Sequence, residues 1–153
     1  MVTALVNDEA RNAQIVDEAI KHGNRGTVLI VSDRVEHCRV LAALLSGKAH
    51  DAATLTGGTP KAERLQIVAD VQSGKVQFLI STLSLISEGF DASGLCVLLL
   101  ATPVSFKGRI IQTSGRILRP GKGKRPLVLD FCDSAVGVLR HGSRKRLTIL
   151  KGL

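Results

Sequence analysis

The chain has 153 residues, of which 44% are hydrophobic and only 3% aromatic, so we expect one domain with a largely aliphatic core. No apolar run reaches the roughly 18 residues of a membrane span, and the first residues lack a signal-peptide pattern, so a cytoplasmic protein without membrane contact is predicted. The formal net charge of +8 is uneven, with a balance of −2 over residues 1–104 and +10 over residues 105–153. This asymmetry favours contact with a polyanion over the alternative of a solvated basic tail.

Helical and strand patterns alternate along the chain. Apolar residues recur at helical spacing in four segments, at 8–22, 34–46, 60–73 and 105–118. Short apolar runs typical of buried strands occupy four segments, at 27–32, 76–81, 95–101 and 126–131, and a further strand is expected near 50–55. Gly23 and Gly47 suit helix ends, and Pro60 suits the first turn of a helix. Strands joined by crossover helices predict an α/β fold in which a parallel sheet has helices on both faces, as three layers of a single domain spanning 1–153.

Polar clusters follow most of the predicted strands. Ligands of parallel sheets bind at the carboxyl ends of the strands, so we expect these clusters to share one edge of the sheet. The three cysteines, Cys38, Cys96 and Cys132, lie far apart in apolar stretches, and the four histidines show no ligand spacing. Buried free thiols and no structural metal are therefore predicted.

The segment after the third strand, S-T-L-S-L-I-S-E-G-F-D (81–91), carries small polar groups. Thr82 offers a hydroxyl, Gly89 allows close backbone approach and Asp91 offers a carboxylate. Donors of this kind commonly hold a sugar-phosphate backbone. Taken alone, the segment favours an ordinary turn, because a glycine-containing turn after a strand is usually no more than that.

A second polar segment, Q-T-S-G-R-I-L-R (112–119), places Gln112, Arg116 and Arg119 within about two helical turns. Residues three apart on a helix are surface neighbours, and paired guanidinium groups suit phosphate oxygens. The alternative is a surface helix with exposed salt bridges, but no acidic residue lies between Asp91 and Asp130 to form them. The sequence has no G-x-x-x-x-G-K-[ST] loop to hold the rest of a nucleotide.

Together the two segments, T-x6-G-x-D and then Q-x2-G-R-x2-R, resemble motifs V and VI of superfamily 2 helicases. Residues 28–45 look like the motif IV strand and helix, and residues 55–64 look like the loop and helix that follow. The resemblance to the second RecA-like lobe of these helicases thus covers nearly the whole chain. A motif VI that begins with Gln is closer to the xeroderma pigmentosum group B and restriction-translocase branches than to DEAD-box proteins, which usually begin it with His.

The resemblance implies that ATP binds between this lobe and an N-terminal Walker-bearing lobe of the same protein, which would also hold Mg²⁺. Arg119 would then be the arginine finger, and Arg116 would bind a neighbouring phosphate oxygen or couple the site to motif V. Gln112 would help to hold the γ-phosphate or its water network. Gly89 and Asp91 would line the ribose side, with Asp91 also able to orient an arginine.

The resemblance also implies contacts with one strand of nucleic acid, DNA rather than RNA by analogy with those branches. The residues expected to make these contacts are Thr82, Thr56, Gly57, Arg64, Ser32 and Arg34. The expected function is the C-terminal motor lobe of an ATP-dependent helicase or translocase, inactive as an ATPase when isolated. The alternative is a non-catalytic nucleic-acid-binding α/β module, although four Phe and no Trp or Tyr leave little surface for base stacking.

Overall fold

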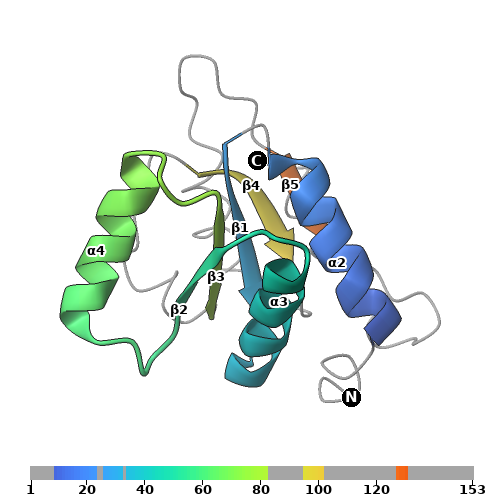
Figure 1. Ribbon diagram of the computed structural model, residues 1–153, viewed down its shortest axis with the longest axis horizontal. Helices are drawn as coiled ribbons and strands as arrows, with labels where there is room; N and C mark the ends of the chain where they lie inside the picture. The colour runs from blue at the N-terminus through green and yellow to red at the C-terminus, as the bar shows by residue number, and fades with distance from the viewer. Residues whose placement is uncertain (1–8, 24–25, 33, 83–94, 102–126, 131–153) are drawn as a thin grey trace, which may run out of the picture.

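The structure, a computed structural model, describes residues 9–23, 26–32, 34–82, 95–101 and 127–130 (Figure 1). Within these ranges the elements are α2 (Glu9–Lys21), β1 (Thr27–Ser32), α3 (Val35–Gly47), β2 (Ala52–Leu55), α4 (Lys61–Gln72), β3 (Phe78–Thr82), β4 (Leu95–Leu100) and β5 (Leu127–Asp130). The predicted helix over 105–118 lies outside the described residues.

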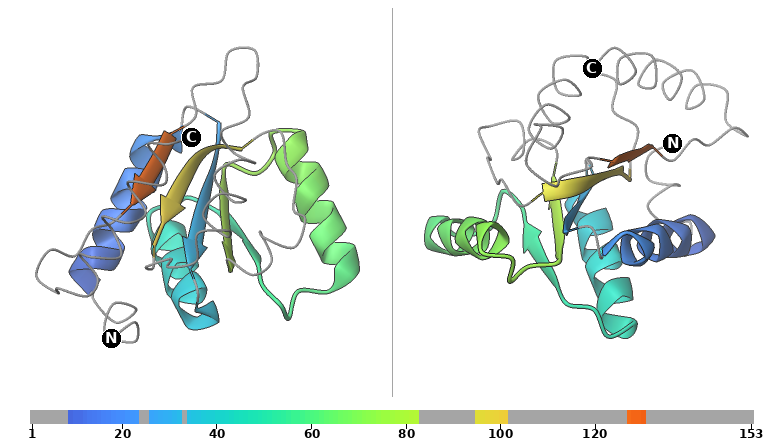
Figure 2. Two further views of the ribbon diagram at one scale, coloured as in Figure 1. Left: turned by 180° about the vertical axis from the view of Figure 1, so that it is seen from behind. Right: turned by 90° about the horizontal axis from the view of Figure 1, so that it is seen from above.

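The five strands form one sheet in the order β2-β3-β1-β4-β5, and every neighbouring pair is parallel. The chain leaves β1 toward one edge of the sheet through α3 and returns to β3 through α4. Because crossovers between parallel strands are right-handed, these two helices lie on opposite faces (Figure 2). Helices α2 and α3 pack on one face and α4 on the other, which confirms the predicted three-layer α/β fold.

The core is aliphatic and lies mainly between the sheet and the α2–α3 layer. The helices contribute six buried side chains, Ile15, Val16, Ala19, Cys38, Leu41 and Leu45. The strands contribute six more, Val28, Ile30, Phe78, Ile80, Val97 and Leu99. The alternate strand residues Leu29, Leu79 and Leu98 are also fully buried, so these strands are covered on both faces, as their continuous apolar runs predicted.

The observed ends of the elements lie within two residues of the predicted ones, and β1 matches its prediction at both ends. Strand β2 begins at Ala52 rather than at residue 50, because a turn follows α3. In this turn Ala49 has a φ of 62°, and the His50 N–H donates to the Leu45 carbonyl at 2.9 Å. Pro60 precedes α4 directly rather than lying in its first turn, with φ −58° and ψ 148°.

Cys38 is a free, buried thiol, as predicted. Burial raises its pKa to about 11, so the thiol is protonated and unreactive at neutral pH. Cys132 lies outside the described residues. Within the described ranges, no group of three His, Cys, Asp or Glu side chains could hold a metal ion. The helices there are also too short or too polar to cross a membrane.

Candidate functional site

The carboxyl ends of three adjacent strands bring the predicted contact residues together. Ser32 at the end of β1 is in register with Thr82 at the end of β3, and Leu55 of β2 is in register with Ser81. Thr56 therefore follows β2 at the level of Thr82. Adjacent strands lie about 4.8 Å apart, so Ser32, Thr82 and Thr56 form a row along what is here called the carboxyl edge.

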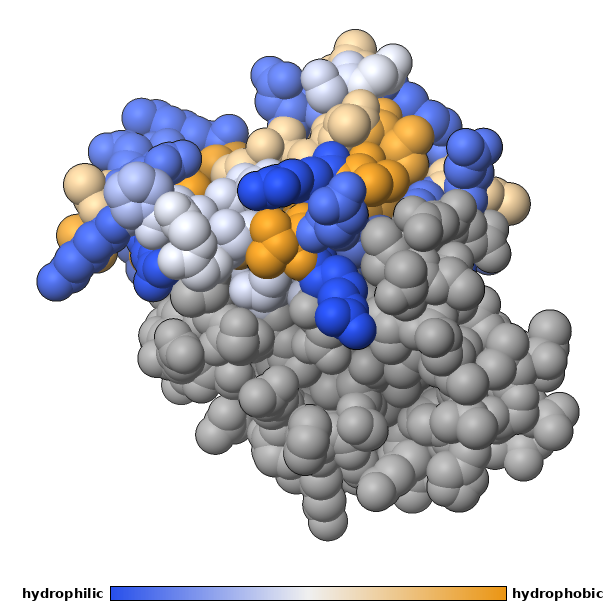
Figure 3. Space-filling model, turned by 90° about the horizontal axis from the view of Figure 1, so that it is seen from below, coloured by the Kyte–Doolittle hydropathy of each residue, from blue (hydrophilic) through white to orange (hydrophobic). Residues whose placement is uncertain are grey.

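The strand arrows of β1, β3 and β4 point downward in Figure 1, so the view from below in Figure 3 faces the carboxyl edge. The coloured part of this face mixes hydrophobic residues with strongly hydrophilic ones, rather than presenting one continuous apolar surface. A surface of this mixed kind suits a polar ligand better than an apolar partner.

Ser32 belongs to a buried hydrogen-bond network. Its Oγ lies 3.0 Å from His37 Nδ1, and the Arg34 backbone N–H donates to the same Oγ at 3.2 Å. On the other side of the ring, His37 Nε2 lies 2.7 Å from Asn12 Oδ1. Ser32 and His37 are 0% exposed and Asn12 is 2% exposed, so water does not compete for these bonds.

The partners determine which nitrogen of His37 carries the proton. An amide oxygen only accepts, so Nε2 is the N–H that donates to Asn12, and Nδ1 accepts from the Ser32 hydroxyl. Burial, and to a lesser extent the nearby Arg11 cation, lowers the pKa of His37 from 6.5 to about 4. The ring is therefore neutral at neutral pH, which is what allows Nδ1 to accept from the Ser32 hydroxyl.

Ser32 and Arg34, both predicted to contact nucleic acid, differ in exposure. The Ser32 side chain is fully buried, and its hydroxyl proton is directed to His37. Arg34 is exposed and lies at the N-cap of α3 with extended backbone, φ −122° and ψ 126°. Of the two, Arg34 is the side chain that this part of the edge presents to solvent.

Thr56 and Gly57 lie in the loop between β2 and α4, and Arg64 contacts this loop from the first turn of α4. The Thr56 N–H donates to Thr59 Oγ1 at 3.0 Å, and the Thr59 N–H donates back to the Thr56 carbonyl at 3.1 Å. The Arg64 guanidinium donates from Nε to the Thr59 carbonyl at 2.8 Å and from Nη2 to the Gly57 carbonyl at 3.0 Å. Arg64 therefore holds the loop in shape and uses two of its five N–H groups to do so.

A hollow of about 470 Å³ lies beside this loop. Its lining comes from α3, β2, the loop and α4, through Arg39, Ala42, Thr54, Thr56, Gly58, Thr59, Pro60 and Glu63. Arg39 and Thr59 are not among the contact residues predicted from the sequence. The T-x-x-T spacing of the loop was an available signal for Thr59, whereas the position of Arg39 depends on how α3 packs beside β2.

Thr82 ends β3 at 7% exposure, with its carbonyl accepting a hydrogen bond from Ser81 Oγ at 3.1 Å. The other predicted site residues, Gly89, Asp91, Gln112, Arg116 and Arg119, lie outside the described residues. Their roles stay predictions.

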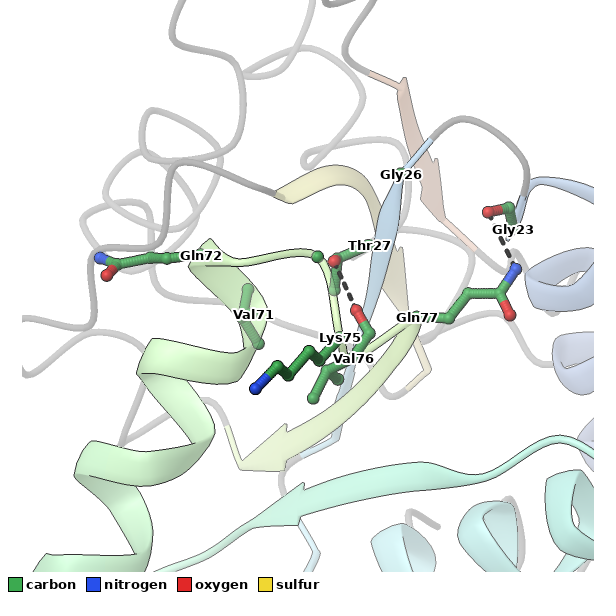
Figure 4. A pocket seen from close by; sticks show the side chains of 9 residues that line it. Gly23, Gly26, Thr27, Val71, Gln72, Lys75, Val76 and Gln77 are labelled. Carbon is green, nitrogen blue, oxygen red and sulfur yellow. Dashed lines mark hydrogen bonds between the residues drawn. The ribbon is translucent and has the colours of Figure 1, made fainter.

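A second hollow, of about 490 Å³, lies at the opposite, amino-terminal edge of the sheet (Figure 4). Two hydrogen bonds join residues of its lining. Thr27 Oγ1 donates to the Val76 carbonyl at 2.7 Å, and Gln77 Nε2 donates to the Gly23 carbonyl at 3.0 Å. The first bond connects the start of β1 with the segment just before β3. The second connects the residues that follow α2 with that same segment before β3. This hollow is therefore part of the scaffold, because ligands of parallel sheets bind at the other edge.

The parallel sheet with helices on both faces has the fold of a RecA-like lobe. Solved structures with this architecture include T4 UvsW, with a TM-score of 0.80 and 18% identity over 96% of this chain and 33% of that one. They also include S. cerevisiae Dbp5 bound to RNA and ADP BeF3, with a TM-score of 0.77 and 16% identity over 93% of this chain and 37% of that one. At these identities the likeness establishes the fold alone.

The family follows from the sequence. The model of the helicase conserved C-terminal domain matches residues 11–121, and the chain belongs to this family. Among curated relatives, "Probable helicase D10" of Escherichia phage T5 is 30% identical over 131 residues, which are 84% of this chain and 29% of that protein. The predicted relation to superfamily 2 helicases is thus confirmed. The chain spans 20–29% of the length of the curated relatives that it matches.

Proposed function

We propose that this chain is the C-terminal motor lobe of an ATP-dependent translocase that moves along nucleic acid. One observation carries the proposal: the helicase family match extends through both the 82–91 and the 112–119 segments, on a fold whose carboxyl edge collects the contact residues. The sequence has no Walker loop, so ATP would be held mainly by a second lobe. Dbp5, which shares the fold, has been solved with both RNA and ADP BeF3.

On the nucleotide side, Arg119 would act as the arginine finger, stabilising the charge that develops on the transferred phosphoryl group. Arg116 and Gln112 would hold neighbouring phosphate oxygens or water, and Gly89 and Asp91 would line the ribose side. Mg²⁺ would be bound by the second lobe and the phosphates, since no Asp-Glu pair follows an apolar strand in this sequence.

On the nucleic-acid side, the loop shaped by Arg64 would present Thr56 and Gly57 to a phosphate of one strand. Thr82 would contact the same strand, and Arg34 would add a positive charge one strand farther along the edge. We favour DNA because the Gln-initiated motif VI resembles the xeroderma pigmentosum group B and restriction-translocase branches. Opening and closing of the cleft between the lobes would turn ATP hydrolysis into steps along the strand.

The experiment that tests this function replaces Arg119 in the assembled two-lobe protein. Arg119→Ala should lower the ATPase rate by about 10³-fold or more, while the affinity for DNA stays within about twofold of the parent. Arg144→Ala, which removes an arginine of the basic tail outside the motif, is the matched control and should leave ATP turnover unchanged. Near-normal ATP hydrolysis by Arg119→Ala would refute the arginine-finger role.

The second candidate, a non-catalytic nucleic-acid-binding module, is favoured by the +10 balance of residues 105–153. It makes a different prediction for the same two variants. Arg119→Ala and Arg144→Ala would then weaken DNA binding to similar extents, and the parent protein would show no ATPase with either DNA or RNA present.

A further inference from the structure

The Asn12–His37–Ser32 network connects α2 with the carboxyl edge. Asn12 lies on α2, His37 in the first turn of α3 and Ser32 at the end of β1, and the three side chains are joined by contacts of 2.7 and 3.0 Å. The network ends at the Arg34 backbone N–H, 3.2 Å from Ser32 Oγ. Arg34 in turn is the exposed N-cap residue that precedes α3.

Each hydrogen bond of the network has one direction. The ring donates to Asn12, and the Ser32 hydroxyl donates to the ring. With its proton directed inward, Ser32 Oγ turns its acceptor lone pairs toward the Arg34 N–H. The orientation of the serine hydroxyl, and with it the bond to Arg34, therefore depends on a histidine that accepts at Nδ1.

We propose that His37, supported by Asn12, is a positioning residue for Arg34 at the nucleic-acid-binding edge. By fixing the Ser32 hydroxyl it orients the Arg34 backbone, and so sets the direction in which the Arg34 side chain leaves the edge. This role rests on the proposed function, in which Arg34 contacts nucleic acid.

Two features separate this role from simple filling of the core. The N-cap of α3 has no side-chain hydrogen bond of its own. Its carbonyl accepts from the Cys38 N–H at 3.1 Å, and its N–H donates to Ser32 Oγ, so Ser32 holds the side of the Arg34 peptide that faces the carboxyl edge. The low pKa of His37 also keeps the ring in the neutral form that accepts from Ser32. A leucine or phenylalanine at position 37 would fill a similar volume, but it could not accept a hydrogen bond from the Ser32 hydroxyl and so could not orient it.

The test is a double-mutant cycle on the full chain, measured by fluorescence anisotropy with a labelled oligo-dT strand at low salt. His37→Phe keeps the ring volume and removes both nitrogens. It should weaken binding by about five- to tenfold when Arg34 is present, and by less than about twofold in an Arg34→Ala background. Ser32→Thr keeps the hydroxyl and should retain most of the affinity, whereas Ser32→Ala should behave like His37→Phe.

Leu45→Ala is the control for loss of stability alone, because Leu45 is buried at the far end of α3 from the edge. Equal losses of affinity in Leu45→Ala and His37→Phe, or a full loss with His37→Phe in the Arg34→Ala background, would overturn the positioning role. If His37→Phe does not fold, Asn12→Leu replaces it in the same cycle. Unchanged binding in both Arg34→Ala and Thr56→Ala would instead refute the nucleic-acid edge of the proposed function.

Discussion

At the scale of single residues, burial decides what the polar groups of this lobe can do. His37 is fully enclosed, faces the Arg11 cation from α2 and is bonded on both ring nitrogens. A proton added at Nδ1 would abolish acceptance from Ser32 and place a second positive charge near Arg11. The folded protein therefore resists protonation of this ring far more than the unfolded chain does.

This difference predicts a pH-dependent stability. The pKa of His37 is about 4 in the folded state, against 6.5 as its ordinary value. Between these values the unfolded chain binds the proton more readily, so the free energy of unfolding falls as the pH drops from about 6.5 toward 4, by up to about 3 kcal/mol. Above pH 6.5 this contribution is constant.

Urea unfolding at a series of pH values, for the parent and for His37→Phe, measures this effect. The two proteins differ only at residue 37, so the difference between their pH profiles isolates the contribution of His37. Parallel profiles would show that His37 contributes nothing to the pH dependence.

At the scale of elements, the hydrophobic pattern predicted nearly all of the described fold. Strands buried on both faces appear in the sequence as uninterrupted apolar runs, and β1, β3 and β4 were found where such runs lie. The start of β2 was wrong by two residues, because the left-handed position after α3 falls on Ala49, which carries no glycine signal. Turn hydrogen bonds to Leu45 hold Ala49 there in spite of its side chain.

The candidate site could be predicted from the sequence only where its residues lie close together within one motif. Thr56, Gly57 and Arg64 lie close together in sequence, and in the structure Arg64, from the first turn of α4, is bonded to the loop that contains the other two. The link between Asn12 and His37 joins residues 25 positions apart and depends on how α2 packs on α3, which no local pattern encodes. Long-range polar pairs of this kind have no periodicity to reveal them.

The junction between α2 and β3 offers a test at this scale. A Cβ added at Gly23 would lie 2.7 Å from Gln77 Nε2 and 3.1 Å from Phe78 Cζ. Gly23→Ala must therefore displace the Gln77 amide, which donates to the Gly23 carbonyl, and crowd a buried ring. We expect a loss of about 1–2 kcal/mol in the free energy of unfolding.

Gly47→Ala is the matched control for Gly23→Ala. It lies in the last turn of α3, where an added Cβ meets nothing within 4 Å. Alanine is the better helix former, so this variant should be unchanged or more stable by about 0.5–1 kcal/mol. Urea unfolding measures the free energy of unfolding of both variants. Equal stabilities of Gly23→Ala and Gly47→Ala would argue against close packing at Gly23.

At the scale of the whole molecule, the charge and the scaffold are separated along the chain. Residues 1–104 contain most of the described scaffold and have a balance of −2, although Arg34 and Arg64 lie at or beside its carboxyl edge. Residues 105–153 carry the balance of +10. If the proposed function is correct, long-range attraction to nucleic acid comes from the C-terminal part, and the scaffold contributes short-range contacts.

The salt dependence of binding tests this division of roles. The affinity of a cationic protein for a single strand falls with salt at a slope of about 0.7 per phosphate neutralised. Replacing Lys122, Lys124 and Arg125 by Gln should therefore reduce the slope for an oligo-dT strand by up to about 2. The matched variant replaces Lys21, Lys48 and Lys75 by Gln, which removes the same charge from the other part of the chain, and it should leave the slope nearly unchanged. If this second variant instead lowers the slope as much as the first, net charge alone governs binding and the C-terminal part holds no special surface for the strand.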